Sequence, residues 1–520
     1  MRFLYKIKPF IVLMILVTCI VSSCTKDFKE LNISPSLVTE NLVKPDNLFS
    51  MVLKESIFHI PDLGRLNDGS PGRISEFAGF MASESSGNPF RNTDYDFYFN
   101  NFYRIYLINI NEAIRLTQQD PALSNKNAMA RIFRVWLWQN LTDMYGDIPY
   151  TEAAQERDHL IAEPKYDKQE DIYKDLFTQL KAATDQLKDD PSQRGYGAAD
   201  ILFKGDVSAW QKFANSLRLR MAMRVRYVDN TLAQQNISEV INAPLISANA
   251  ENATLLSEGP NAALNANKSP LLILLAGNLI EPRHIGFPVL EILAKNHDPR
   301  MSIYFRLPNL IDPSSSIPYR ARPINVYDTE TFRYIRDSIS LVGAYFEAPQ
   351  FSFNLITAAE VNYLKAEAML AGLTPGDANA AYRTGIQLAM EQYGVPPASI
   401  TTFLASSAAT LSGTSEQQLE QIIDQKYITL IYQSNEAWAE YRRTGYPKMW
   451  LGSGPTDTQG QIPRRLTYPA DEYSKNQVNV TAAVSNYQEG DKLTGRMWWD
   501  VKPGLPYAHP KQGTYPPESW

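Results

Sequence analysis

The chain contains 520 residues, with 50 Lys or Arg against 56 Asp or Glu, so its formal net charge at pH 7 is −6. This acidic balance argues against nucleic acid and against a polybasic membrane contact, since both depend on an excess of basic residues. The two cysteines, Cys19 and Cys24, both lie near the N-terminus. The fold must therefore be held by a packed core rather than by a disulfide framework.

The first predicted element is an export segment. Three basic residues precede an apolar stretch over residues 9–20, which is too short to span a bilayer comfortably. Cys24 follows in the order Val-Ser-Ser-Cys, which is typical of a bacterial lipoprotein cleavage box. We therefore expect residues 1–23 to be removed as a signal peptide and Cys24 to carry a lipid anchor. The alternative is an ordinary signal peptide with an incidental cysteine.

Residues 24–45 mix charges, Asn, Ser and Pro without a sustained period, which predicts a tether. Helix-length segments follow in pairs, and successive antiparallel pairs predict a mainly α, tetratricopeptide-like stack. No strict 34-residue repeat supports this interpretation. The expected pairs are 99–117 with 131–145, 168–187 with 210–225, 353–370 with 377–393, and 416–432 with 436–443.

Two of these helices differ in the faces that they are expected to bury. Apolar residues surround the segment 131–145 almost completely, which predicts a helix buried between neighbours. The segment 210–225 is apolar on one side only and is predicted to pack on that side. Its basic residues would form a solvated or salt-bridged face: Lys212, Arg218, Arg220 and the following Arg226.

Two long stretches are predicted to be irregular. Eight prolines lie between positions 282 and 349, and prolines recur with Gly, Asn and Ser over 444–520. We expect a single domain over 46–520 with irregular insertions around 245–350 and 444–520. Such segments, carried on a rigid scaffold, are expected to form the binding side.

No catalytic motif stands out in the sequence. The five histidines are scattered, and there is no metalloprotease motif, nucleophile elbow, phosphate loop or dinucleotide fingerprint. Asp143 and Asp147 flank a Gly turn and are expected to accept hydrogen bonds from free backbone N–H groups rather than act as an acid/base pair. A glycoside hydrolase needs only two carboxylates, so it remains an alternative, as does a helical scaffold that binds only protein.

Two further carboxylates, Glu360 and Glu367, lie two turns apart on one predicted helix face. No His accompanies them at ligand spacing, so we expect no metal and no cofactor. We expect ion pairs between helices instead, with Arg218, Arg220, Arg442 or Arg443.

Several strings occur in the order found in one known family. They are DFKELN at 27–32, DMYGDIPY at 143–150, YDKQ at 166–169, ANSLRLRMA at 214–222, EVNYLKAEA at 360–368, EAWAEYRRTGYP at 436–447 and RRLTYP at 464–469. On these strings the chain resembles the SusD/RagB family of outer-membrane nutrient-binding lipoproteins. The resemblance implies a surface-exposed, non-catalytic lipoprotein that captures an oligomeric nutrient, usually a glycan. It also implies delivery of that nutrient to a partner SusC-like TonB-dependent transporter.

Two segments are expected to contact the ligand. The segment 87–98 combines aromatic, amide and charged side chains, which suit the faces and hydroxyls of a sugar. An alternative is that its aromatics anchor the next helix, as expected for Phe97 and Phe99, while Trp498 and Trp499 are expected to be core or interface anchors. The sequence does not distinguish a glycan from a peptide ligand. The candidate residues are Asn88, Phe90, Arg91, Asn92, Asp94 and Tyr95, and, in the Pro-rich region, Arg283, His284, Tyr304, Tyr319 and Arg320.

Overall fold

The computed structural model describes residues 43–58, 72–83, 90, 96–153, 161–257, 283–311, 316–326, 336–346, 348, 350–454 and 456–513. Residues Pro45–Trp520 form one compact unit. The predicted signal peptide, Cys24 and nearly all of the tether lie outside the described residues. Within the described ranges, no helix is both long and apolar enough to cross a membrane.

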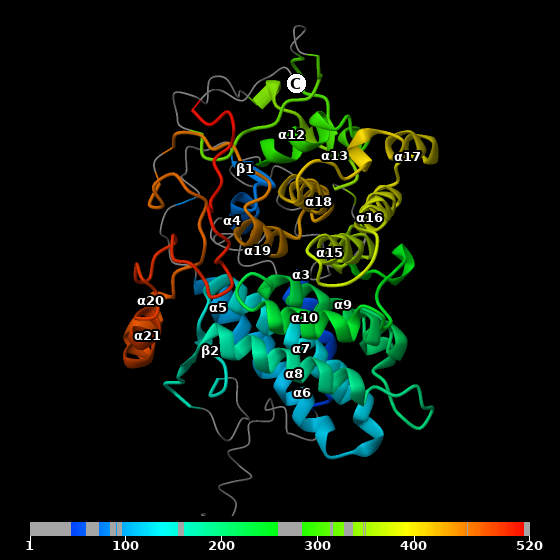
Figure 1. The fold of residues 1–520 in the computed structure, drawn as a ribbon. Helices are drawn as coiled ribbons and strands as arrows, with labels where there is room; N and C mark the ends of the chain where they lie inside the picture. Colours follow the sequence, from blue (N-terminus) through cyan, green and yellow to red (C-terminus); the bar gives the residue numbers. More distant parts are fainter. Residues whose placement is uncertain are drawn as a thin grey trace, which may run out of the picture. The chain divides into compact units, whose positions relative to one another are not determined.

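The first half of the compact unit is built from helices, coloured blue to green in Figure 1. These are α3 (Pro45–Phe58), α4 (Gly72–Phe77), α5 (Asp96–Asn101), the π-helical segment η3 (Phe102–Leu107), α6 (Ile108–Gln118), α7 (Ser124–Tyr145), α8 (Gln169–Gln186), α9 (Val207–Val225) and α10 (Asn230–Val240). α6 packs on α3 and α7, α7 on α8, α8 on α9, and α9 on α10. The first two predicted helix pairs are therefore confirmed.

The second half contains helices α12 (Phe287–Lys295), α13 (Met301–Tyr304), α15 (Ala358–Leu370), α16 (Ala378–Gln392), α17 (Pro397–Leu404), α18 (Ser415–Thr429), α19 (Ser434–Thr444), α20 (Ala470–Lys475) and α21 (Gln477–Val484). α15 packs on α16 and α18, and α18 packs on α19. The remaining two pairs are thus present, and the mainly α stack of helix pairs is confirmed.

One predicted boundary is wrong. Residues 353–356 belong to strand β8 (Ser352–Ile356) rather than to the helix that follows it. Thr357 separates the two elements, because its side chain accepts a hydrogen bond from the Glu360 N–H at 3.2 Å and so caps α15. The pairing of β8 with another strand, which no local pattern encodes, keeps these residues extended.

Short strands and helices make the insertions less irregular than predicted. Residues 245–350 include α12 and α13, and 444–520 include α20 and α21. Pro288 stands in the first turn of α12, where its missing N–H leaves no bond unmade. The antiparallel strand pairs in the described part are β1 (Met81–Ser83) with β5 (Arg283–Ile285), β2 (Ile148–Pro149) with β3 (Tyr166–Asp167), β4 (Ala253–Leu256) with β8, and β6 (Phe305–Arg306) with β7 (Leu341–Val342).

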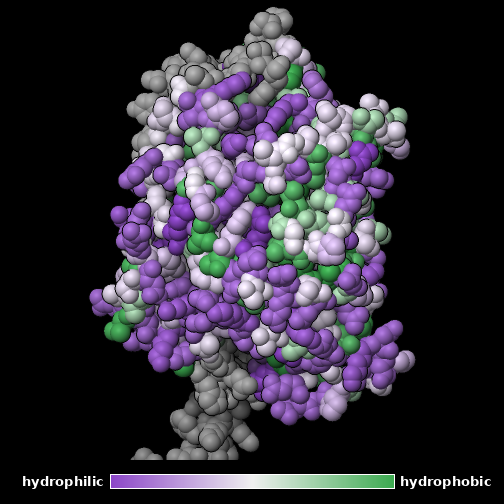
Figure 2. Space-filling model, viewed as in Figure 1, coloured by the Kyte–Doolittle hydropathy of each residue, from purple (hydrophilic) through white to green (hydrophobic). Residues whose placement is uncertain are grey.

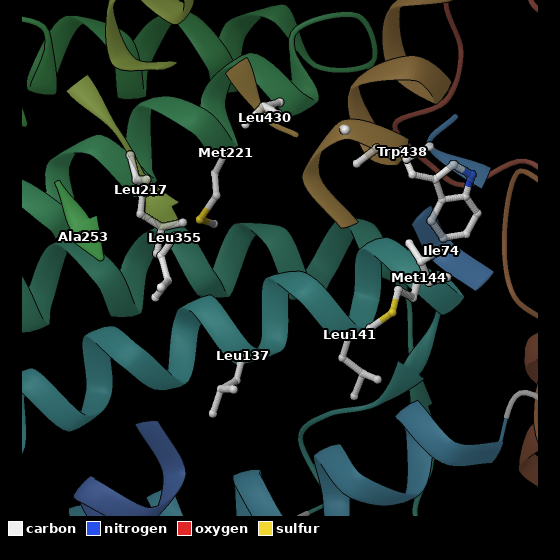
Figure 3. Packing of buried hydrophobic residues seen from close by; sticks show 14 of the residues in the cluster. Ile74, Leu137, Leu141, Met144, Leu217, Met221, Ala253, Leu355, Leu430 and Trp438 are labelled. Atoms are coloured by element: carbon white, nitrogen blue, oxygen red, sulfur yellow. The ribbon is translucent and has the colours of Figure 1, made fainter. Parts of the chain in front are cut away.

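The core of the unit is continuous across both halves, with α7 at its centre. Leu137, Leu141 and Met144 of α7 are fully or almost fully buried, which confirms the predicted helix apolar on nearly all sides. Figure 3 shows Leu137 and Leu141 pointing away from Met221 of α9, whereas Met144 lies beside Ile74 of α4. α8, by contrast, buries one stripe only, and polar residues dominate the face near α8 and α10 in Figure 2.

Helix α9 departs from its prediction. Arg218, Arg220 and Arg224 are all buried, so the helix is covered on its basic side as well. Arg220 forms a two-bond ion pair with Glu360, with distances of 2.7 Å from Nε and from Nη2. Of the two predicted states of this basic face, solvated or salt-bridged, the salt-bridged state is therefore correct.

The other predicted ion pairs have mixed outcomes. Arg443 pairs with Glu367 through two hydrogen bonds of 2.6 and 2.7 Å, as expected. Arg218 pairs instead with Glu239. Arg442 forms no ion pair with a carboxylate in the described part of the chain: its Nη1 donates to the backbone oxygens of Asp143 and Arg464. Its guanidinium also lies 3.6 Å from the centroid of the Trp438 ring.

Candidate binding cavity

A cavity of about 170 Å³ lies where α5 and η3 meet α9, β8 and the start of α19. Its walls combine aromatic rings with carboxamides and one Arg/Glu pair, a composition that offers both stacking surfaces and hydrogen-bonding groups. The lining side chains include the aromatic Phe97, Tyr98, Phe102, Tyr106, Trp136, Phe353 and Tyr432, the carboxamides Asn101, Asn140, Asn354, Gln433 and Asn435, and the charged Arg220 and Glu436.

Two backbone irregularities shape this cavity. η3 is a π-helical segment inserted between α5 and α6, and its residues Phe102 and Tyr106 both line the cavity. Tyr432, another lining residue, has a φ of 65°, a left-handed conformation that is costly for a bulky residue. π-helical segments and strained backbone are frequent at functional sites, because packing alone rarely favours them.

Four polar atoms of the lining side chains lack hydrogen-bond partners among the described residues. They are the donors Asn101 Nδ2 and Gln433 Nε2 and the acceptors Asn435 Oδ1 and Glu436 Oε1, and all four are buried. Leaving a buried donor or acceptor unsatisfied costs about 1–3 kcal/mol. All four atoms have almost no surface accessible to water, so they lie behind the cavity wall rather than on its surface.

Glu436 brings a negative charge to the cavity wall. Its Oε2 accepts a 2.6 Å hydrogen bond from Arg224 Nη2, and Lys426 Nζ lies 3.8 Å from its Oε1. Burial opposes ionisation of Glu436, but Arg224, Arg220 and Lys426 outweigh it and hold its pKa below the ordinary value. The carboxylate is therefore ionised at neutral pH, and its charge is already balanced by the arginines around it.

The structure leaves most of the predicted segment 87–98 undescribed. Asn88, Arg91, Asn92, Asp94 and Tyr95 all lie outside the described residues. Phe90 is described, and it is fully buried, with its ring centroid 6.1 Å from that of Phe77. The ring of Phe90 is thus enclosed by the core, and its contact with a ligand stays a prediction.

The aromatics that follow behave largely as anchors. Phe99 is buried in the core, which confirms its predicted structural role. Phe97 is only half-buried: it packs against the core and also lines the cavity.

The Pro-rich candidates divide in a similar way. Tyr304 is fully buried and donates a 2.8 Å hydrogen bond from its hydroxyl to the Ile428 carbonyl, so a ligand contact at Tyr304 stays a prediction. His284 is buried in β5, and the side chain of Arg283 lies outside the described part. Tyr319 and Arg320 are half-buried, and the Arg320 N–H donates to Ser340 Oγ at 2.9 Å. Neither Tyr319 nor Arg320 lines the cavity.

Asp143 and Asp147 have structural partners. Asp147 accepts a 2.9 Å hydrogen bond from the Gln169 N–H, as predicted for a carboxylate near a helix end. Asp143 instead accepts from side chains, Tyr173 at 2.6 Å and Trp499 at 2.9 Å. Across the described residues, no group of three or more His, Cys, Asp or Glu side chains is placed to hold a metal ion.

The residues with unpartnered atoms were missed by sequence reasoning. Gln433, Asn435 and Glu436 immediately precede or begin the family string at 436–447, and Asn101 follows the predicted segment 87–98. An amide at the N-cap of α19, Gln433, and another in its first turn, Asn435, resemble ordinary residues of a helix start. Only the approach of α5 and β8 makes these side chains part of a cavity.

Comparisons with known proteins place this geometry in context. A SusD-like protein-family model described as "Starch-binding associating with outer membrane" matches residues 70–469. No curated protein matches the chain significantly in sequence.

Several solved structures share the fold. One is described as a chitin-binding protein; it is 28% identical, with a TM-score of 0.78, and the match covers 88% of this chain and 100% of that one. A Bacteroidetes SusD-like protein is 25% identical, with a TM-score of 0.77 and coverage of 88% and 100%. A SusD homolog from Bacteroides uniformis is also 25% identical, with a TM-score of 0.72 and coverage of 88% and 98%.

Proposed function

This chain belongs to the SusD-like family of binding proteins associated with the outer membrane, and we propose that it captures an oligosaccharide there and delivers it to a SusC-like TonB-dependent transporter. Because the family binds nutrients and does not act on them chemically, the prediction of a non-catalytic protein is confirmed, and the glycoside hydrolase alternative is not favoured.

The observation that carries the proposal is the cavity beside η3. Sugars expose apolar C–H faces that stack on aromatic rings and hydroxyls that both donate and accept hydrogen bonds. The cavity provides aromatic rings such as Phe97, Trp136 and Phe353 together with the half-buried carboxamides of Asn140 and Asn354. We propose that Tyr319, Arg320 and the undescribed candidates of segment 87–98 contact other sugar units of the same oligosaccharide.

Chitin oligosaccharides are the first ligands to test, because a 28% identical relative is described as a chitin-binding protein. Peptides are the competing class of nutrient. The mature chain should bind a chitin oligosaccharide with a dissociation constant in the micromolar to millimolar range, about −8 to −4 kcal/mol, since a protein that hands over its ligand must release it.

Isothermal titration calorimetry measures this affinity, and chromatography of the recovered ligand tests for chemistry. We expect the oligosaccharide to be recovered intact after prolonged incubation. Sustained cleavage would instead make the chain a glycoside hydrolase. Binding of peptides, with no neutral glycan bound from a broad panel, would overturn the glycan assignment.

Delivery requires contact with the transporter. A tagged form of the chain, purified from detergent-solubilised outer membranes of its own bacterium, should retain a TonB-dependent transporter identified by mass spectrometry. Recovery of the tagged chain without any transporter would contradict this part of the proposal and would favour a binding protein that acts alone.

A further inference from the structure

We propose that a second site, an open groove between the α12–α13 turn and α17, binds an oxyanion, namely the carboxylate, sulfate or phosphate group of a small acidic molecule. The site lies apart from the cavity beside η3 and goes beyond the proposed capture of a neutral oligosaccharide. It is carried by the side chains of Lys295 and His297, by hydroxyl groups from neighbouring segments and by the backbone that fixes the imidazole.

The groove is large enough for a small ligand and has no acidic lining. Its volume is about 660 Å³, within the range of about 300–1,000 Å³ that is usual for small-molecule sites. Lys295 at the end of α12 and His297 in the following turn line it, with residues of α17, α18 and the 3₁₀ turn η8 (Ser407–Ala409). No Asp or Glu lines it within the described part of the chain. In a protein of net charge −6, such a groove is suited to an anion.

The ammonium group of Lys295 is available to an external anion. It is exposed and forms no hydrogen bond or ion pair with the described residues. Two carboxyl groups lie near it. Glu291, one turn back in α12, is hydrogen-bonded to His509 at 2.9 Å. Burial raises the pKa of Asp424 to about 8, so this second carboxyl is largely protonated at neutral pH and leaves Lys295 without a charged partner.

The backbone holds His297 in a conformation that costs free energy. Its φ is 49°, in the left-handed region that a side chain disfavours. The His297 N–H donates to the Ala294 carbonyl at 3.0 Å and the Asp298 N–H to the Leu293 carbonyl at 2.8 Å. Glycine is the usual residue at this position of such a helix end. A side chain kept there at a cost is a frequent mark of a functional site.

A buried ion pair makes the turn rigid. Asp298 and Arg300, which follow His297, are 1% and 0% exposed, and Arg300 Nη2 lies 2.6 Å from Asp298 Oδ2. The Arg300 N–H also donates to Asp298 Oδ1 at 2.9 Å. The charge of Asp298 is therefore compensated by Arg300, and the imidazole of His297, which has no hydrogen bond to the described residues, keeps at least one N–H for a ligand.

Hydroxyl groups complete the set of donors. Ser399 of α17 and Ser407 of η8 line the groove, and their hydroxyls form no hydrogen bond with the described residues. Thr402, by contrast, already donates to the Ala398 carbonyl at 2.9 Å. An ammonium, an imidazole N–H and free hydroxyls are donors that the oxygens of carboxylate, sulfate and phosphate accept. The competing explanation is a solvated surface that binds no ion specifically.

The test uses the variants Lys295→Met and His297→Gly. Glycine fits the left-handed backbone, so His297→Gly should leave the melting temperature about unchanged or raise it while it weakens anion binding. Lys204→Gly is the matched control. Lys204 is an exposed residue outside the groove with a φ of 55°, so its replacement also removes a cation and relieves the same conformation.

NMR of the isotopically labelled histidine rings measures binding at one residue. The mature chain is titrated with inorganic phosphate, sulfate and glucuronate at fixed pH and ionic strength. The His297 signal, identified by its loss in His297→Gly, should shift to saturation, whereas the signals of the buried His284 and His509 should not move. Lys295→Met should weaken the affinity by about three- to tenfold, and Lys204→Gly should bind as the parent does.

Ligand-observed NMR with glucuronate needs no histidine signal and should show a similar weakening for His297→Gly. A stronger response to glucuronate would assign the site to an acidic sugar, and a stronger response to phosphate or sulfate would assign it to a free ion; either result supports the site.

Two results would overturn the inference: the absence of a saturable shift of His297 with any of the three anions, or an affinity that falls equally in Lys204→Gly and Lys295→Met. The proposed function would stand in both cases, because binding of a neutral glycan is measured separately.

Discussion

Asp424, on α18, is a half-buried acid with unusual surroundings. Its Oδ1 is buried and has no hydrogen-bond partner among the residues described. Burial, followed by the nearby charge of Glu420, raises the pKa of Asp424 to about 8, although Lys295 opposes the shift. Its carboxyl is therefore largely protonated in the folded protein at neutral pH, whereas in the unfolded chain it ionises near pH 4.

This difference predicts a pH dependence of stability. Between about pH 4 and pH 8 the folded state holds a proton that the unfolded state releases, so the free energy of unfolding falls as pH rises through that window. Asp424→Asn should remove this loss, which makes the variant more stable than the parent by about 1–3 kcal/mol at pH 8 and about equal to it at pH 4. Urea denaturation at both pH values measures the difference. Parallel pH curves for parent and variant would contradict the raised pKa, and exposed Asp189→Asn is the control.

At the scale of elements, buried ion pairs join helices that are distant in sequence. Arg443 of α19 binds Glu367 of α15 and also Glu440, one turn back in its own helix. Arg224 of α9 reaches Glu436 and Glu440 of α19. Such pairs constrain the relative positions of α9, α15 and α19, and therefore position the start of α19 in the cavity wall.

Glu367→Gln should show how strongly this cluster is coupled. The change leaves Arg443 and Arg226 with less compensating charge in a buried place, and breaking a buried pair typically costs about 3–5 kcal/mol. Urea denaturation should detect a loss of this size. The exposed pair Asp471 and Lys475 is the control, since Asp471→Asn should hardly change the midpoint.

The same cluster has a pH signature of its own. Burial opposes ionisation of Glu367, but Arg443 and Arg226 lower its pKa below the ordinary value, so its contribution is present above about pH 4.5 and is lost as pH falls further. The loss caused by Glu367→Gln should therefore shrink in acid. An equal loss at pH 7 and at low pH would instead point to altered packing.

At the scale of the whole molecule, the fold places a binding cavity in a protein associated with the outer membrane, and the proposed lipid at Cys24 would hold it there. Cys24→Ala should release the protein into the soluble fraction or leave it unprocessed, because stable attachment needs the acyl chains that the thiol and the new N-terminus carry. Membrane fractionation and mass spectrometry measure the outcome. Cys19→Ala, within the predicted signal peptide, is the matched control and should leave attachment intact; equal membrane attachment of Cys24→Ala would show that Cys24 is not the anchor.

Local sequence determined most of the helices, because the signals that begin and end a helix lie within a few residues. Asp206, Asp229 and Asp377 each accept a hydrogen bond from a backbone N–H at a helix start. Gly445 ends α19 with a φ of 83°, a conformation that is easily available only to glycine. The ordered strings, which span most of the chain, likewise sufficed to predict the family.

Tertiary structure alone decided which polar residues are buried and which of them meet. Arg220 and Arg224 have the sequence pattern of an exposed basic face, but α15 and α19 cover them and supply carboxylates. Residues 353–356 have a pattern compatible with helix, but pairing with β4 keeps them extended. Asn101 and Gln433 are far apart in sequence and line one cavity. Hydrogen bonding and periodicity within a helix depend on near neighbours, whereas burial and the shape of a cavity depend on contacts between distant segments, and a single sequence does not contain those contacts.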